Sequence, residues 1–124
     1  MNIVLMSNGF NLQDDFHYEN LYFKHQFSNW RGLFLDTSTR TVSEKQLRWL
    51  TKELQHTNEP IAIFMHHPPI ISGVPFMDRN HALDNMSEFQ RVLTKYDHTI
   101  PIFSGHYHVE KTVCKGNIAF QITP

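Results

Sequence analysis

The sequence predicts an α/β protein in which short apolar strands alternate with amphipathic helices. Residues 61–65, Ile-Ala-Ile-Phe-Met, are apolar without alternation, a pattern typical of a strand covered on both faces in a parallel sheet. Two segments with apolar side chains at helical spacing, residues 43–54 and 85–96, lie on either side of this strand in the sequence. A succession of strand, helix, strand, helix, strand and hairpin is typical of a layered α/β fold.

Strands are expected first at residues 2–6 and 21–27, and then at residues 32–36, where an apolar run ends in turn-forming residues. The first helix should begin after Ser43, because this hydroxyl can cap the helix and Gln46, three residues later, completes a capping box. The apolar face of this helix would consist of Leu47, Leu50 and Leu54.

A long loop is expected after the strand at residues 61–65. Pro68 and Pro69 stop that strand, and residues 70–84 make a connection longer than a compact fold requires. Such loops often carry substrate contacts, and Phe76 and Met77 could shape a pocket for a base or an alcohol. A plain connection with partly buried apolar side chains is an equally good interpretation.

The C-terminal third predicts a helix, a strand and a hairpin. Asn85 and Glu88 can cap the helix. Its apolar face would consist of Phe89, Val92, Leu93 and Tyr96. Residues 100–103 form a second buried strand, and residues 108–114 pair with residues 118–122 across a Lys-Gly-Asn turn.

The composition fits one globular domain over residues 1–124 and narrows the choice of partners. A formal net charge of -1 gives no electrostatic reason to expect nucleic acid or an anionic membrane as a partner. No apolar run approaches the roughly 20 residues that a membrane-spanning helix needs. Cys114 is the only cysteine, so no internal disulfide can form, and a cytoplasmic location is expected.

The chemistry is expected at two histidine clusters that follow the two buried strands. Residues 65–69, Met-His-His-Pro-Pro, end the first strand, and residues 104–108, Ser-Gly-His-Tyr-His, end the second. Ligands of open α/β sheets bind beyond the carboxyl ends of the strands, so His66, His106 and His108 should converge there. Three imidazoles at one point suit zinc, manganese, iron or nickel.

The remaining histidines are given other roles. His67 would lie beside the metal ligands, where it either supports a ligand or faces phosphate as a donor. His81 is left open, because it lies in the long loop. A lone histidine is more often a surface or core residue than a ligand, and we interpret His17, His25, His56 and His98 in that way.

The two clusters resemble the last two signature motifs of the calcineurin-like metallophosphoesterases. The matching residues are His-His-Pro-Pro at 66–69 and Gly-His-Tyr-His at 105–108, and the pair at this separation is a specific pattern. More narrowly, the chain is similar to the bacterial cyclic-nucleotide phosphodiesterases over residues 35–38, 42–50 and 81–85. The resemblance covers nearly the whole chain.

The resemblance implies a four-layer sandwich of two sheets between helices, of which this chain would be the C-terminal half. It implies that His66 and His106 bind the second of two metal ions and His108 the first, the ions being manganese, iron or zinc. A bridging hydroxide would attack phosphorus, and both ions would stabilise the charge on the phosphoryl oxygens. Substrates would be cyclic nucleotides or other phosphodiesters, with His81 and Asn85 as candidates for substrate binding.

The chain lacks the three N-terminal motifs of the family, which are Asp-x-His, Gly-Asp-x-x-Asp and Gly-Asn-His followed by Asp or Glu. These motifs supply the bridging aspartate, the asparagine ligand and the histidine that assists the leaving group. Two cations roughly 3.5–4 Å apart need a bridging anion, and neutral histidines supply no negative charge. We therefore expect at most one metal ion per chain and no appreciable turnover by the chain alone.

The missing half should also leave an apolar sheet face and unpaired edges, which favour association. We expect a homo-oligomer in which copies cover each other. Three interpretations compete: a part of a metal-dependent phosphodiesterase that is inactive alone, a non-catalytic metal-binding or regulatory module, and a purely structural oligomer. The intact ligand histidines favour the first.

Overall fold

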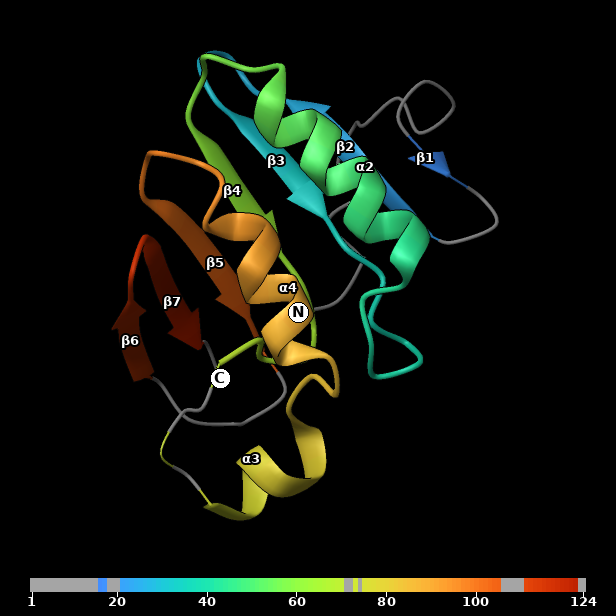
Figure 1. Ribbon diagram of the computed structural model, residues 1–124, viewed down its shortest axis with the longest axis vertical. Coiled ribbons are helices and arrows are strands. Elements are labelled where there is room, and N and C mark those ends of the chain that lie inside the picture. Colours follow the sequence, from blue (N-terminus) through green and yellow to red (C-terminus); the bar gives the residue numbers. More distant parts are fainter. Residues whose placement is uncertain (1–15, 18–20, 71–72, 74, 106–110, 123–124) are drawn as a thin grey trace.

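The structure is a computed structural model that describes residues 16–17, 21–70, 73, 75–105 and 111–122. In chain order the elements are β1 (Phe16–His17), β2 (Tyr22–Gln26), β3 (Arg31–Phe34), α2 (Glu44–Gln55), β4 (Ile61–Phe64), α3 (Pro75–His81), α4 (Met86–Leu93), β5 (Ile100–Ser104), β6 (Lys111–Lys115) and β7 (Ile118–Ile122). Strands and helices alternate through the middle of the chain, which confirms the predicted α/β class (Figure 1).

The strands form one seven-stranded sheet in the order β1-β2-β3-β4-β5-β7-β6 (Figure 1). Strands β3, β4, β5 and β7 are parallel to one another, and the pairs β1–β2, β2–β3 and β6–β7 are antiparallel. Phe34 of β3 lies beside Phe64 of β4, and Phe64 lies beside Phe103 of β5. The residues that follow these three strands therefore lie at one edge of the sheet.

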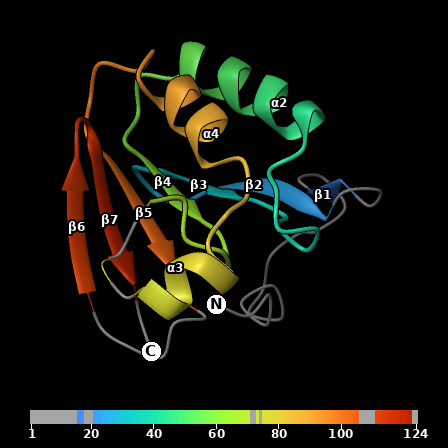
Figure 2. The same ribbon diagram turned by 60° about the horizontal axis from the view of Figure 1, so that its bottom comes forward.

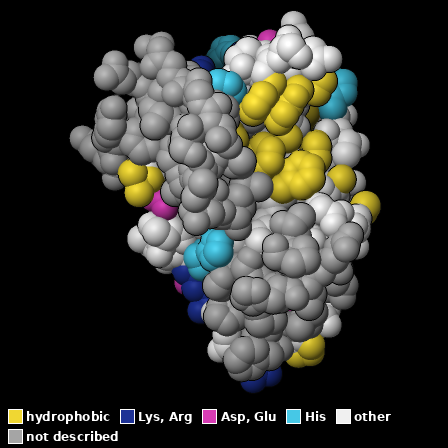
Figure 3. Space-filling view, turned by 180° about the vertical axis from the view of Figure 1, so that it is seen from behind, with side chains coloured by type: hydrophobic (Ala, Val, Ile, Leu, Met, Phe, Trp, Pro, Cys, Tyr) yellow, Lys and Arg dark blue, Asp and Glu magenta, His cyan; other side chains and the backbone are white. Residues whose placement is uncertain are grey.

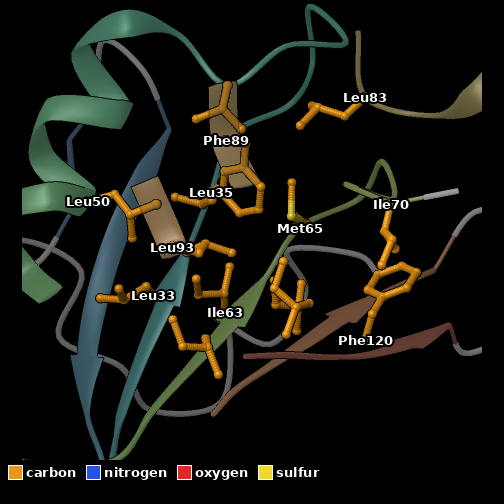
Figure 4. Packing of buried hydrophobic residues seen from close by; sticks show 14 of the residues in the cluster. Leu33, Leu35, Leu50, Ile63, Met65, Ile70, Leu83, Phe89, Leu93 and Phe120 are labelled. Atoms are coloured by element: carbon orange, nitrogen blue, oxygen red, sulfur yellow. The ribbon is translucent and has the colours of Figure 1, made fainter. Parts of the chain in front are cut away.

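Helices α2 and α4 cover one face of the sheet (Figure 2). Leu50 and Leu54 of α2 and Phe89 and Leu93 of α4 are buried, so the predicted apolar faces are confirmed. Figure 4 shows these helices packing on strand side chains, among them Leu33, Ile63 and Phe120. Burial of this apolar area is the main force that holds the helix layer to the sheet.

Helix α2 begins as its sequence predicts, but only half of the capping box forms. Ser43 is the N-cap, and its Oγ accepts a hydrogen bond of 3.2 Å from the backbone N–H of Gln46. The side chain of Gln46 does not return to the cap backbone as the box requires. It is buried and instead binds the backbone of Asp36, which follows β3.

Helix α4 also begins at the predicted place, with Asn85 as its N-cap, but the predicted side-chain cap is wrong. No side-chain hydrogen bond from Asn85 reaches the helix. Its amide pairs instead with the backbone of Val42, across 43 residues of sequence. A tertiary partner has replaced the local one, and the sequence near Asn85 carries no sign of it.

The expected loop at residues 70–84 contains the seven-residue helix α3, so the prediction of a structureless connection is wrong. Pro75 is the first residue of this helix, a position at which proline is favoured because its missing N–H would have no helical partner. Asp78 lies in the first turn, where a negative charge interacts favourably with the helix dipole. Figure 1 shows α3 beyond the carboxyl ends of β4 and β5.

The predicted strands at residues 21–27, 32–36, 61–65 and 100–103 are confirmed, each with slightly different ends. The hairpin is confirmed as β6 and β7, and Gly116 in its turn has a positive φ of 57°. The strand expected at residues 2–6 lies outside the described residues. Among the helices that the described residues form, none has the length and apolar character needed to cross a bilayer.

The other face of the sheet carries a row of aromatic rings. Phe34 stacks on Phe23 at 4.6 Å and on Phe64 at 4.7 Å, and Phe64 stacks on Phe103 at 5.3 Å between ring centroids. Strand alternation places Ala119 on the same face, because its neighbours in β7 are buried under the helices. Figure 3 shows apolar side chains gathered on the side away from the helices.

Candidate functional site

The predicted site lies where the carboxyl ends of three parallel strands meet. Residues 35–37 follow β3, residues 65–67 follow β4, and Gly105 follows β5. Met65 continues the pairing between β4 and β5, because its N–H donates to the carbonyl of Phe103 at 3.0 Å. The first histidine cluster and the start of the second are thus brought to adjacent positions, as the sequence predicts.

His66 is exposed, and its backbone is held by the neighbouring strand. The hydroxyl of Ser104, the last residue of β5, donates to the carbonyl oxygen of His66 at 2.7 Å. Ser104 is completely buried, so water does not compete for this hydrogen bond. Ser104 therefore fixes the backbone of one predicted ligand relative to the strand that leads to the other two.

His67 is half-buried and contacts Thr37 at the end of β3. Oγ1 of Thr37 lies 2.7 Å from Nδ1 of His67, and the backbone N–H of His67 donates to the same oxygen at 3.3 Å. The rings of His66 and His67 meet edge to face, with 5.1 Å between their centroids. The two neighbouring histidines consequently present their rings in different directions.

The segment that carries Thr37 is held from the helix side. Gln46 of α2 accepts from the N–H of Asp36 and donates to its carbonyl oxygen, both at 2.8 Å. One residue later, the carbonyl of Thr37 accepts from the N–H of Arg40 at 2.8 Å, which closes a turn. Thr37 is thereby fixed at the end of β3 with 2% of its surface exposed.

The turn after Thr37 is joined to the segment between α3 and α4. Arg40 has a positive φ of 67°, and its guanidinium donates to the carbonyl oxygens of Ala82 and Arg79 at 2.9 and 2.8 Å. In return, the N–H of Asp84 donates to the carbonyl of Arg40 at 2.8 Å. These hydrogen bonds place the connection between the helices beside the candidate site.

Asn85, predicted to bind substrate, uses its amide within the fold. Its Oδ1 accepts from the N–H of Val42 at 2.9 Å, and its Nδ2 donates to the carbonyl of Val42 at 2.7 Å. His81, the second such candidate, is the last residue of α3, and its side chain lies outside the described part of the structure. Substrate binding by either residue stays a prediction.

His106 and His108, the other predicted ligands, lie outside the described residues. Across the described ranges, no three His, Cys, Asp or Glu side chains gather closely enough to hold a metal ion. Of the predicted ligand set, the structure therefore places His66. Gly105, which precedes His106, is buried at the end of β5.

A shallow hollow lies at the opposite end of the parallel strands. Glu59, Tyr96 and His98 are among the residues that line it. Pro60 and Thr99 in the same hollow directly precede β4 and β5, so it is separated from His66 by the length of the strands. The hollow takes no part in the predicted site.

Sequence reasoning missed two residues of the site, Thr37 and Ser104. Ser104 ends β5 and Thr37 lies three residues after β3, and each forms a hydrogen bond with a histidine that follows the adjacent strand β4. A small hydroxyl side chain at the end of an apolar run or shortly after it was the available signal. Its significance depends on which strands are neighbours, and the sequence leaves that order open.

Comparison with known proteins agrees with this fold. No protein-family model matches the chain. It is 34% identical over 123 residues to a probable cyclic nucleotide phosphodiesterase of Fibrobacter succinogenes, a match that covers 99% of this chain and 48% of the relative. It is also 34% identical over 87 residues to the 3',5'-cyclic adenosine monophosphate phosphodiesterase of Escherichia coli, with 65% of this chain and 31% of that protein covered.

The fold has a solved counterpart in a dimetal phosphatase of Danio rerio, with a TM-score of 0.72 at 15% sequence identity. The match covers 98% of this chain and 53% of the phosphatase, which confirms a partial metallophosphoesterase fold. The chain spans about half the length of the Fibrobacter relative, at 48%, and less of the Escherichia coli one. The chain therefore belongs to the calcineurin-like metallophosphoesterases, and the two bacterial relatives are described as cyclic nucleotide phosphodiesterases.

Proposed function

We propose that this chain supplies the histidine ligands of a metal-dependent phosphodiesterase that acts on cyclic nucleotides, and that it is inactive alone. The observation that carries the proposal is the position of His66. It is exposed at the carboxyl end of β4, and its carbonyl is bound by Ser104, two residues before His106. The substrate class comes from the relatives, which are described as cyclic nucleotide phosphodiesterases.

The proposed ligands are His66, His106 and His108, and the proposed ion is manganese, iron or zinc. Imidazole nitrogen suits all three metals, and His66 is an exposed residue at the carboxyl end of β4. A divalent ion held there would act as a Lewis acid on a phosphoryl oxygen. Because neutral imidazoles add no negative charge, a second cation roughly 3.5–4 Å away would be repelled, and one ion per chain is expected.

Metal content of the purified chain tests the ligand set. Elemental analysis would compare the wild type with His66→Ala, His106→Ala and the control His98→Ala, which alters an exposed histidine at the opposite end of the strands. We expect up to one equivalent in the wild type and the control, and none in the other two variants. Two tight equivalents in the wild type, or equal metal in all four proteins, would contradict the proposal.

Complementation tests the catalytic half of the proposal. The chain alone should not hydrolyse bis(p-nitrophenyl) phosphate at a rate above the metal-only blank. Hydrolysis should appear when the part of the Fibrobacter relative that this chain does not cover is added in trans. It should be absent when the added chain carries His66→Ala. Turnover by the unmixed chain, retained in His66→Ala, would show that the activity has another source.

A second candidate function, an oligomeric module without catalysis, is favoured by the aromatic sheet face. The stacked rings of Phe34, Phe64 and Phe103 lie on the sheet face opposite to α2 and α4, because the preceding residue of each strand is buried in the core under the helices. No described strand position on this face from β2 to β7 is charged, because Lys24 and Arg31 make their contacts on the helix side. Two copies could therefore pack face to face without charge repulsion.

A further inference from the structure

Thr37 and His67 form the most closely defined side-chain contact at the proposed site. Oγ1 of Thr37 lies 2.7 Å from Nδ1 of His67, within the normal range for a hydrogen bond between an oxygen and a nitrogen. Neutral imidazole carries one ring proton, so the contact has two forms. Either the hydroxyl donates to Nδ1, or Nδ1–H donates to the hydroxyl.

The surroundings of Thr37 decide between these forms. Its hydroxyl already accepts a hydrogen bond from the backbone N–H of His67. Among the described residues, the hydroxyl has only two hydrogen-bond partners, this N–H and Nδ1 of His67. Since Thr37 is 2% exposed, its own proton has no access to water and needs a buried acceptor. Nδ1 of His67 is that acceptor.

We propose that Thr37 is a positioning residue that donates its proton to Nδ1 of His67, so that His67 carries its ring proton on Nε2 and serves as a hydrogen-bond donor instead of a metal ligand. A ligating nitrogen needs a free lone pair. The lone pair of Nδ1 accepts the hydrogen bond from Thr37, and Nε2 carries the ring proton. Neither nitrogen of His67 is then available to an ion.

The chemistry of such a donor identifies its ligand. A neutral N–H beside a metal-bound phosphodiester suits an anionic phosphoryl oxygen, since hydrogen bonds to charged acceptors are shorter and stronger than neutral ones. The phosphoryl assignment rests on the proposed function. The tautomer assignment does not, because it follows from the contacts of Thr37 alone.

Nitrogen-15 NMR of the histidine rings tests the tautomer in the whole 124-residue chain without metal. At about pH 8, where imidazoles are ordinarily neutral, Nδ1 of His67 should have the shift of an unprotonated nitrogen and Nε2 that of a protonated one. Thr37→Ser keeps the hydroxyl and should preserve this pattern. Thr37→Val removes it and should produce a mixture of tautomers. A protonated Nδ1 in the wild type would overturn the proposal.

Zinc titration separates the donor from the ligands. His66→Gln should lower zinc affinity by more than the roughly tenfold that loss of a supporting group costs, whereas His67→Gln should leave it unchanged. Equal losses in the two variants would make His67 a ligand and overturn the proposal. If the wild type binds no zinc, the proposed function fails, and the NMR pattern still decides the tautomer.

Phosphate titration tests the ligand of the donor. Inorganic phosphate should move the Nε2 resonance of His67 further than that of the control His98, which lines the hollow at the other end of the strands. Thr37→Ser should behave like the wild type, and Thr37→Val should respond less. Equal movement at the two histidines would contradict the phosphoryl assignment.

Discussion

The side-chain amide of Gln46 forms hydrogen bonds with both backbone groups of Asp36. Each is 2.8 Å long, and Gln46 is 2% exposed. This pairing joins the first turn of α2 to the residue directly before Thr37. No strand of the described residues pairs with the backbone of half-buried Asp36, so the glutamine supplies hydrogen-bond partners for both of its groups.

Replacing Gln46 with methionine should therefore destabilise the protein. The variant keeps a side chain of similar size but loses both hydrogen bonds to half-buried Asp36, at a net cost of about 0.5–1.5 kcal/mol for each. Urea unfolding followed by circular dichroism would measure the change. Gln55→Met, at the exposed end of the same helix, is the matched control and should have the stability of the wild type. Equal stability of the two variants would contradict this account.

Asn85 should stabilise the folded chain in the absence of substrate. Its amide makes two hydrogen bonds with Val42, and Asn85→Ala removes both, so we expect a loss of about 1–3 kcal/mol in the free energy of unfolding. Asn85→Asp keeps the acceptor and loses the donor, so its free energy of unfolding should lie between those of the wild type and Asn85→Ala. The control is Asn58→Ala, at an exposed position. An Asn85→Ala variant as stable as the control would show that Asn85 does not stabilise the folded chain.

The sequence predicted the elements whose signals are local. The apolar runs of β4 and β5, the apolar faces of α2 and α4 and the glycine turn of the hairpin all depend on residues within a few positions of one another. The short helix α3 was missed because its seven residues give too few turns for a clear period. Pro75 at its first position, where proline is favoured, was a signal that the prediction did not use.

The site was predicted less completely, for a physical reason. His66 and His67 stand out as histidines after an apolar strand, but Thr37 acts on His67 across 30 residues and Ser104 acts on His66 across 38. Such partners depend on strand order and on parallel register, which periodicity does not specify. The same limit explains Asn85 and Gln46, whose capping patterns were visible while their tertiary partners were not.

Association through the aromatic face should respond to a single charge. Ala119→Lys places a cation on that face in β7, beside Pro101 of β5, and should convert a dimer to a monomer at micromolar concentration. Light scattering coupled to size-exclusion chromatography would measure the mass. Ser87→Lys, on the exposed side of α4, adds the same charge and should leave the mass unchanged. A wild-type chain that is already monomeric would contradict the proposed association.

The hydroxyl of Ser104 should influence metal binding without touching the ion. Ser104→Ala leaves the carbonyl of His66 without its 2.7 Å donor, so the backbone that carries the proposed ligand becomes free to shift. Loss of a supporting partner typically lowers metal affinity by about 10–100-fold, and we expect the lower part of this range because Ser104 holds the backbone and not the ring.

Zinc titration would measure the change in metal affinity, and Ser104→Cys would test partial rescue by a weaker donor. The stability loss should be close to the roughly 1 kcal/mol of one hydrogen bond. Ser87→Ala, on the exposed surface of α4, should change neither quantity. If Ser104→Ala lowers stability as expected but binds zinc like the wild type, the hydrogen bond belongs to the fold alone, and His66 is positioned by other contacts.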